Sequence, residues 1–169
     1  MKYFYDEIIH FSAETDDECR EMAKRFERQQ KAYFKEFNKI KNKLPKAVLE
    51  VDENTHDAMI TNITPLYKAG KLDIAMTIEL GWPPARENQK KGTLLHCDVK
   101  KFNIDIIGDN TDPFERNYLW YKYGELLMED GFWTHNFIFS PMPSELYIKC
   151  RSLEWIEAER DKKSISCKI

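Results

Sequence analysis

Residues 71–80, Lys-Leu-Asp-Ile-Ala-Met-Thr-Ile-Glu-Leu, decide the fold class, because apolar and polar side chains alternate strictly along them. This period of two is typical of a strand with one buried face and one solvated face. The preceding residues 59–64 are predicted to form its partner strand, joined through a turn at Lys68-Ala69-Gly70. The centre of the chain therefore begins an antiparallel sheet.

The strand pattern continues towards the end of the chain. Residues 94–107 predict one long strand or two, with a bulge near Lys100-Lys101 where the apolar set changes face. Residues 118–128 also suit a helix, but the following Asp130-Gly131 is a two-residue hairpin turn and favours a strand that pairs with 132–139. Alternation resumes over 146–150, and 153–157 either extend this strand or form a last one.

A helix is expected before the sheet. Thr15-Asp16-Asp17-Glu18 has the form of a capping box, and Pro45 marks the end of the pattern. Between them runs one apolar stripe at helical spacing: Cys19, Met22, Phe26, Tyr33, Phe37, Ile40 and Leu44. A continuous helix over 16–44 would be about 44 Å long, longer than the core of a compact domain, so we expect a break, a bend or an overhanging end.

These elements predict an α+β fold: a long N-terminal amphipathic helix, then an antiparallel β-meander of about six strands curled into a sandwich or open barrel. Without a linker or internal repeat, residues 1–169 are expected to be a single domain. The helix would occupy 16–44 and the β-rich part 57–157, with a frayed tail over 161–169. After Pro45, a short additional turn of helix is expected at Lys46-Ala47-Val48-Leu49.

Composition limits the class of protein. The chain has 169 residues, 42% hydrophobic and 33% charged, with a net charge of −3. Those values are ordinary for a soluble globular domain. No apolar run is long enough to span a bilayer, and the acidic start does not resemble an export signal, so we expect a cytoplasmic protein.

Recognisable catalytic and cofactor motifs are missing from the sequence. The cysteines and histidines lack the close pairing typical of zinc sites, and the glycines form no phosphate-binding loop. Carboxylates at Glu79, Glu125, Glu145 and Glu154 each fit a polar strand face or turn. We therefore expect no cofactor, no metal and no catalytic residue.

Two groups of side chains are candidates for binding. The first comprises three histidines that strands could bring together, and aromatic residues of the second half of the chain: His56, His96, His135, Trp120, Tyr121 and Trp133. They would line a ligand pocket or an interaction patch. The alternative is that the histidines are hydrogen-bonded at strand edges and the aromatic residues form core and cross-strand pairs.

The second candidate is a basic stripe on the helix, opposite the apolar one: Lys24, Arg28, Lys31, Lys35 and Lys39. Residues 19–46 carry ten basic residues against three acidic ones. This stripe either contacts an anionic partner or is the solvated back of an amphipathic helix. The acidic average of the chain makes nucleic acid an unlikely partner.

A further set of short segments runs along the chain: Met1-Lys2-Tyr3-Phe4 and the charged helix, and then, in the β-rich part, His56-Asp57, 72–80, Leu119-Trp120-Tyr121, 132–139 and Glu145-Leu146-Tyr147-Ile148. In these segments the chain resembles an uncharacterised family of small cytosolic proteins from Gram-positive bacteria, a domain of unknown function. The resemblance implies no activity. The family's helix surface is acidic, whereas this one is basic.

Two hypotheses of function follow from the sequence. The first is a non-enzymatic binding or interaction protein that contacts a partner protein through the helix or an exposed strand. The alternative is a small-ligand-binding protein or enzyme with an aromatic-lined pocket and histidine polar groups. A filled interior with an exposed apolar strip would favour the first, and a deep pocket with converging histidines the second.

Overall fold

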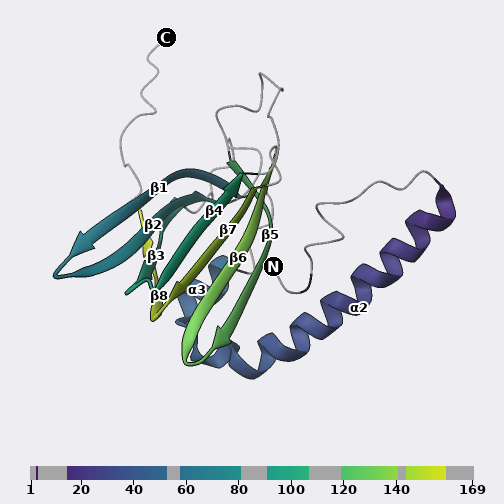
Figure 1. Ribbon diagram of the computed structural model, residues 1–169, viewed down its shortest axis with the longest axis horizontal. Coiled ribbons are helices and arrows are strands. Elements are labelled where there is room, and N and C mark those ends of the chain that lie inside the picture. Colours follow the sequence, from purple (N-terminus) through teal and green to yellow (C-terminus); the bar gives the residue numbers. More distant parts are fainter. Residues whose placement is uncertain are drawn as a thin grey trace, which may run out of the picture.

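The computed structural model describes residues 3, 15–52, 58–80, 91–106, 119–140 and 144–158 (Figure 1). Its helical part comprises α2 (Asp16–Ile40), the 3-10 turn η1 (Lys41–Lys43) and α3 (Lys46–Asp52). The strands are β1 (Met59–Lys68), β2 (Lys71–Glu79), β3 (Lys91–Cys97), β4 (Lys101–Ile106), β5 (Leu119–Glu129), β6 (Phe132–Ser140), β7 (Ser144–Cys150) and β8 (Ser152–Glu157). Among the described residues, no helix is long and apolar enough to cross a membrane.

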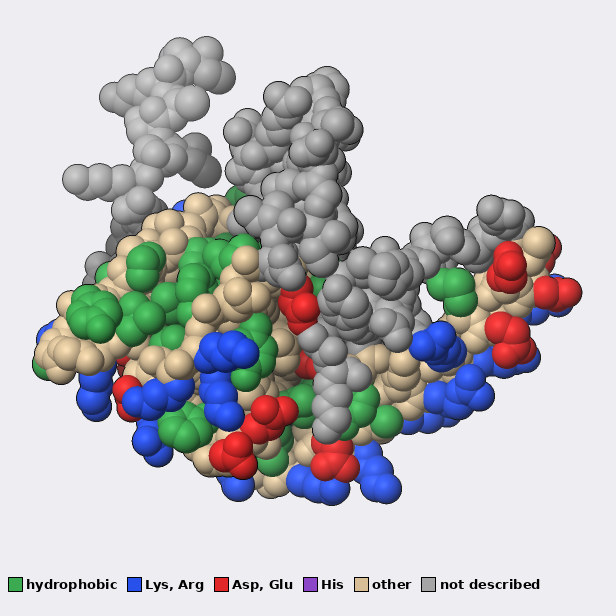
Figure 2. Space-filling model, in the orientation of Figure 1, with side chains coloured by type: hydrophobic (Ala, Val, Ile, Leu, Met, Phe, Trp, Pro, Cys, Tyr) green, Lys and Arg blue, Asp and Glu red, His purple; other side chains and the backbone are tan. Residues whose placement is uncertain are grey.

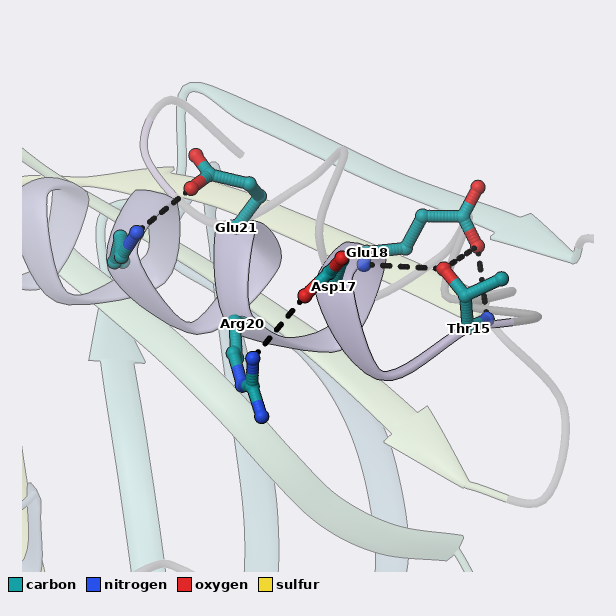
Figure 3. A network of polar contacts seen from close by, with 6 residues as sticks. Thr15, Asp17, Glu18, Arg20 and Glu21 are labelled. Carbon is teal, nitrogen blue, oxygen red and sulfur yellow. Dashed lines mark hydrogen bonds and ion pairs between the residues drawn. The ribbon is translucent and has the colours of Figure 1, made fainter.

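The helix α2 begins at the predicted capping box (Figure 3). The Thr15 hydroxyl accepts a hydrogen bond from the Glu18 backbone N–H at 3.3 Å, and the Glu18 carboxylate accepts one from the Thr15 N–H at 3.0 Å. Only Tyr33 and Phe37 of α2 are buried, so its N-terminal half projects away from the strands (Figure 1). Of the three expected alternatives, a break, a bend or an overhanging end, the structure shows the overhanging end, and the regular helix ends at Ile40 rather than Leu44.

All eight strands pair antiparallel, in the order β4-β7-β6-β5-β1-β2-β3-β8. Strands β5 and β1 are joined by only two residue pairs, Met59 with Trp120 and Ile60 with Leu119. The strands therefore divide into two four-stranded halves, which we call the first half (β4-β7-β6-β5) and the second half (β1-β2-β3-β8). Apolar side chains of both halves meet in one core.

The two halves are also connected where the chain bends between β3 and β4. Asp98 has a positive φ of 52°, and strands β7 and β8 bend at the same level. Backbone hydrogen bonds span the bend from Arg151 N to Cys97 O at 2.9 Å and from Lys100 N to Lys149 O at 2.7 Å. A bend of this kind lets one strand pair contribute to both layers of a sandwich.

The predicted α+β class and antiparallel sheet are confirmed, but the strand count and the meander are wrong. The described part of the chain has eight strands because 94–107 divides at the bend and 152–157 forms its own strand. The order is not a meander because β4 pairs with β7, β8 with β3 and β5 with β1. The predicted tail over 161–169 lies outside the described residues.

Strand β6 is buried on both faces. Trp133, His135 and Phe137 are buried on one face, and Thr134 and Ile138 on the other. Helix α2 packs against the neighbouring strand β5, with Tyr33 and Phe37 in the core cluster. The Asp130-Gly131 turn before β6 is also confirmed, and both residues have a positive φ.

Candidate functional site

Two of the predicted histidines converge in the core. His96 on β3 and His135 on β6 come from different halves, and His96 Nε2 lies 3.0 Å from His135 Nδ1. Their side chains are almost completely buried, and the rings stack with centroids 5.3 Å apart. The pair therefore forms a hydrogen-bonded link between the two halves.

Burial determines the protonation of this pair. It lowers the pKa of His96 to about 4. The pKa of His135 is lowered well below its ordinary value, mainly by burial and secondly by electrostatic repulsion from the neighbouring His96. Both rings are consequently neutral at neutral pH. His96 Nδ1 lies 3.4 Å from the carbonyl oxygen of Ile74, which can only accept. This contact favours the tautomer in which His96 Nδ1 carries the proton and His135 Nδ1–H donates to His96 Nε2.

A small cavity adjoins His135 beneath α3. Its volume is about 10 Å³, roughly the room that one water molecule needs. Side chains from α3 and from both sheet halves line it: Val48, Val51, Asp52, Leu94, Leu126, His135 and Leu153. A cavity of this size does not admit a small-molecule ligand beside the histidine pair.

A second group of buried polar side chains surrounds β5. The Leu126 N–H donates to the Tyr33 hydroxyl at 3.1 Å, and the fully buried Glu125 carboxylate accepts from the Tyr3 N–H at 2.5 Å. Burial, and then the negative charges of Asp52 and Glu125, raise the pKa of Tyr33. These contacts fix α2 and residue 3 to the edge of the first half.

The prediction that Glu125 lies on a polar strand face is wrong, since none of its surface is exposed. Two apolar neighbours at spacing two, Tyr123 and Leu127, were the sequence signal that its face is buried. Tyr33 was placed correctly on the apolar stripe, but its hydroxyl contact with β5 depends on tertiary packing and leaves no local signal.

The remaining predicted aromatic and histidine candidates do not assemble into one described site. His56 lies outside the described residues. Trp120 and Tyr121 lie on β5, where the structure describes their backbone alone. Trp133 is 5% exposed and belongs to the core cluster, as the core alternative expected. In the part of the chain that the structure describes, no group of three or more His, Cys, Asp and Glu side chains could hold a metal ion.

The predicted basic stripe on α2 is extensively paired within the helix. Lys24 contacts Glu21 at 2.7 Å, and Lys31 contacts Glu27 at 2.6 Å. A third pair joins Lys39 and Glu36 at 2.7 Å. Hydrogen bonds from Lys24 and Lys31 lower the pKa values of Glu21 and Glu27. Such pairs support a solvent-exposed helix, and three of the five stripe residues thus have acidic partners on α2 itself.

Among the side chains of the first half that the structure describes, the most exposed large apolar ones lie on its edge strand β4. Phe102 is 37% exposed and Ile104 is 44% exposed, although they are register partners of the fully buried Ile148 and Leu146. Within the described residues, β4 pairs with β7 and with no other strand. The core face of the first half therefore continues onto an open edge.

The fold and its buried polar contacts define an α+β protein in which a projecting helix and a short helix pack against two four-stranded antiparallel halves. Residues 10–146 match the family described as protein of unknown function DUF4085, and the chain belongs to this family. The predicted membership of a family of unknown function is thereby confirmed. No curated protein matches the chain.

Proposed function

We propose that this protein is a non-enzymatic interaction protein that binds a protein partner through the edge strand β4. The observation that carries the proposal is the exposure of Phe102 and Ile104 on a strand with an unpaired edge in the described structure. An exposed edge with apolar side chains is a template for pairing with another strand. Figure 2 shows hydrophobic side chains at the surface over the region where Figure 1 places β1, β2 and β4, and of these three strands β4 alone lies at an end of the described strand order.

The buried polar side chains support the same proposal. The convergence of His96 and His135 favours a ligand site on its own, but their rings are buried against each other and the adjoining cavity holds about 10 Å³. The histidine pair therefore has a structural role, because it joins the two halves in the core. An enzyme would need room for a substrate next to these groups, and the described cavity leaves none.

The test compares proteins retained from a native cell extract by the wild-type chain and by two variants. Ile104→Lys places a charge on the proposed binding edge. Tyr67→Ser is the matched control, because Tyr67 is 79% exposed beside the β1–β2 turn and β1 does not pair with β4. Thermal unfolding verifies that both variants are folded.

We expect a protein that is retained by the wild-type chain and by Tyr67→Ser and is lost with Ile104→Lys. That protein, purified, should then bind with an affinity at least tenfold weaker to Ile104→Lys. The proposal is wrong if Ile104→Lys, in folded form, retains the same proteins as the wild-type chain.

A further inference from the structure

Residues of like charge occupy opposite register positions on β4 and β7. The register places Lys101 opposite Lys149 and Asp105 opposite Glu145. Like charges directly opposite on antiparallel strands destabilise the pair. The two cations have neighbours elsewhere: the Lys101 ammonium lies 5.2 Å from the centroid of the Tyr147 ring, and Lys149 Nζ lies 3.7 Å from Asp130 Oδ2. Within one chain, β4 and β7 thus carry a basic row and an acidic row.

The sequence of β4 is self-complementary. Residues 101–105 read Lys-Phe-Asn-Ile-Asp, with opposite charges at the two ends, apolar side chains inside them and Asn103 at the centre. Antiparallel pairing of two such strands about Asn103 brings position 101 opposite position 105, and position 102 opposite position 104. Paired residues on antiparallel strands have their side chains on the same face.

We infer that β4 pairs with β4 of a second copy of this chain, edge to edge about a two-fold axis at Asn103. This inference rests on the proposed function and names its partner. The basic row of Lys101 and Lys149 in one copy then continues into the acidic row of positions 105 and 145 in the other. Each row then lies beside a row of opposite charge, and this charge complementarity selects the partner.

The opposite face of the sheet gives the same register. Phe102 and Ile104 of one copy lie opposite Ile104 and Phe102 of the other, so the exposed parts of four apolar side chains cover one another. A shift of the axis to position 102 places Ile104 opposite Lys100, and a shift to position 104 places Phe102 opposite position 106. Either shift removes the match of Lys101 with position 105. A C2 interface requires this kind of self-complementarity.

The contact is small. Five residue pairs bury much less than the roughly 1,600 Å² of a standard stable interface, so the dimer should be reversible and dissociate in the micromolar range or above. Its apolar and charged contacts both lie in the one strand pair, and substitutions in β4 should therefore change its affinity directly.

Sedimentation of the purified full chain from about 1 µM to about 500 µM tests the inference. We compare the wild-type chain with Lys101→Glu, Asp105→Lys and the double variant that carries both substitutions. Each single reversal places like charges opposite each other twice in the dimer, and should weaken the dimer about tenfold or more. The double variant restores opposite charges, and should return to within about threefold of the wild-type affinity. Lys68→Glu, at the β1–β2 turn, is the control and should leave the dimer unchanged.

Thermal unfolding of the same variants separates folding from association. Lys101→Glu replaces the Lys101–Lys149 repulsion within one chain by an attraction, so the dilute monomer should be at least as stable as the wild-type monomer while the dimer is weaker. The inference is overturned if the wild-type chain remains monomeric throughout, or if the double variant associates as weakly as the single ones. A monomeric chain whose β4 edge still captures another protein would overturn the second-copy partner alone; a monomeric chain without edge-dependent capture would overturn the proposed function as well.

Discussion

Acidification should destabilise the protein through the buried histidine pair. His96 and His135 lie 3.0 Å apart between the two halves, and both pKa values are lowered by burial. In the unfolded chain these rings titrate near pH 6.5. Between that pH and about 4, the unfolded chain binds protons that the folded chain excludes, so stability present above pH 6.5 is progressively lost as the pH falls.

The size of the loss follows from the difference between folded and unfolded pKa values. Lowering the pKa of His96 from 6.5 to about 4 corresponds to roughly 3 kcal/mol of unfolding free energy over that range. His135 adds a loss in the same direction. While both rings titrate only in the unfolded state, the free energy of unfolding should fall by up to about 2.7 kcal/mol per pH unit. By pH 5 the two rings together should have removed about 4 kcal/mol, which is most of the stability of a protein at the lower end of the usual range of about 5–15 kcal/mol.

Urea unfolding between pH 7.5 and pH 5 measures this slope. In His135→Gln one titrating ring is removed, so the slope should decrease by up to about 1.4 kcal/mol per pH unit, even if the variant is less stable at neutral pH. Glu157→Gln, an exposed carboxylate at the end of β8, is the control and should keep the wild-type slope. NMR of the wild-type imidazoles provides a check that needs no variant: two rings should show no titration between pH 8 and pH 5. Equal slopes for the wild-type chain and His135→Gln, or a normal titration of all four histidines near pH 6.5, would refute the reasoning.

Three further substitutions probe other contacts. Tyr33→Phe removes the acceptor of the Leu126 N–H and should lower the free energy of unfolding by about 1–3 kcal/mol, measured in urea at pH 7.5; a loss below 0.5 kcal/mol would show that this N–H has another partner. Gly92→Ala places a methyl group against the Trp155 ring and 2.6 Å from the Ile156 carbonyl oxygen, so it should cost about 1–3 kcal/mol, whereas Thr93→Ala beside it should cost less. Thr15→Ala removes the capping hydroxyl and should cost about 1 kcal/mol locally. Because the start of α2 is exposed, hydrogen exchange should accelerate in its first turn while Tm stays the same; a lowered Tm would show that this turn packs on the body.

Features specified by neighbouring residues were predictable from the sequence. The alternation along residues 71–80 predicted β2, the Asp130-Gly131 pair predicted the turn before β6, and Thr15 with Glu18 predicted the start of α2. Each signal lies within one turn or one strand, where local propensity and side-chain period act directly. The choice of a strand rather than a helix for residues 119–129 depended on the neighbouring turn, and it was correct.

The division of residues 94–107 was only partly predictable. The change of apolar face predicted an irregularity near Lys100, and the structure has one at Asp98–Lys100. At this irregularity the chain passes from one half to the other. This passage depends on residues 144–157, which pair with both strands and bend at the same level, although they lie about 50 positions further along the chain. No local pattern indicates which strand will become the partner of another.

The features that bear most on function arise from register. His96 meets His135 because β3 and β6 face each other at that level, and Lys101 meets Lys149 because β7 pairs with β4 in that alignment. A slip of β7 by one residue would turn Leu146 and Ile148 out of the core, so their burial fixes the alignment. The same burial thereby forces the like charges of β4 and β7 into common rows. Their repulsion within one chain is then a consequence of the core, and a complementary strand at the β4 edge would offset it further by placing a row of opposite charge beside each row.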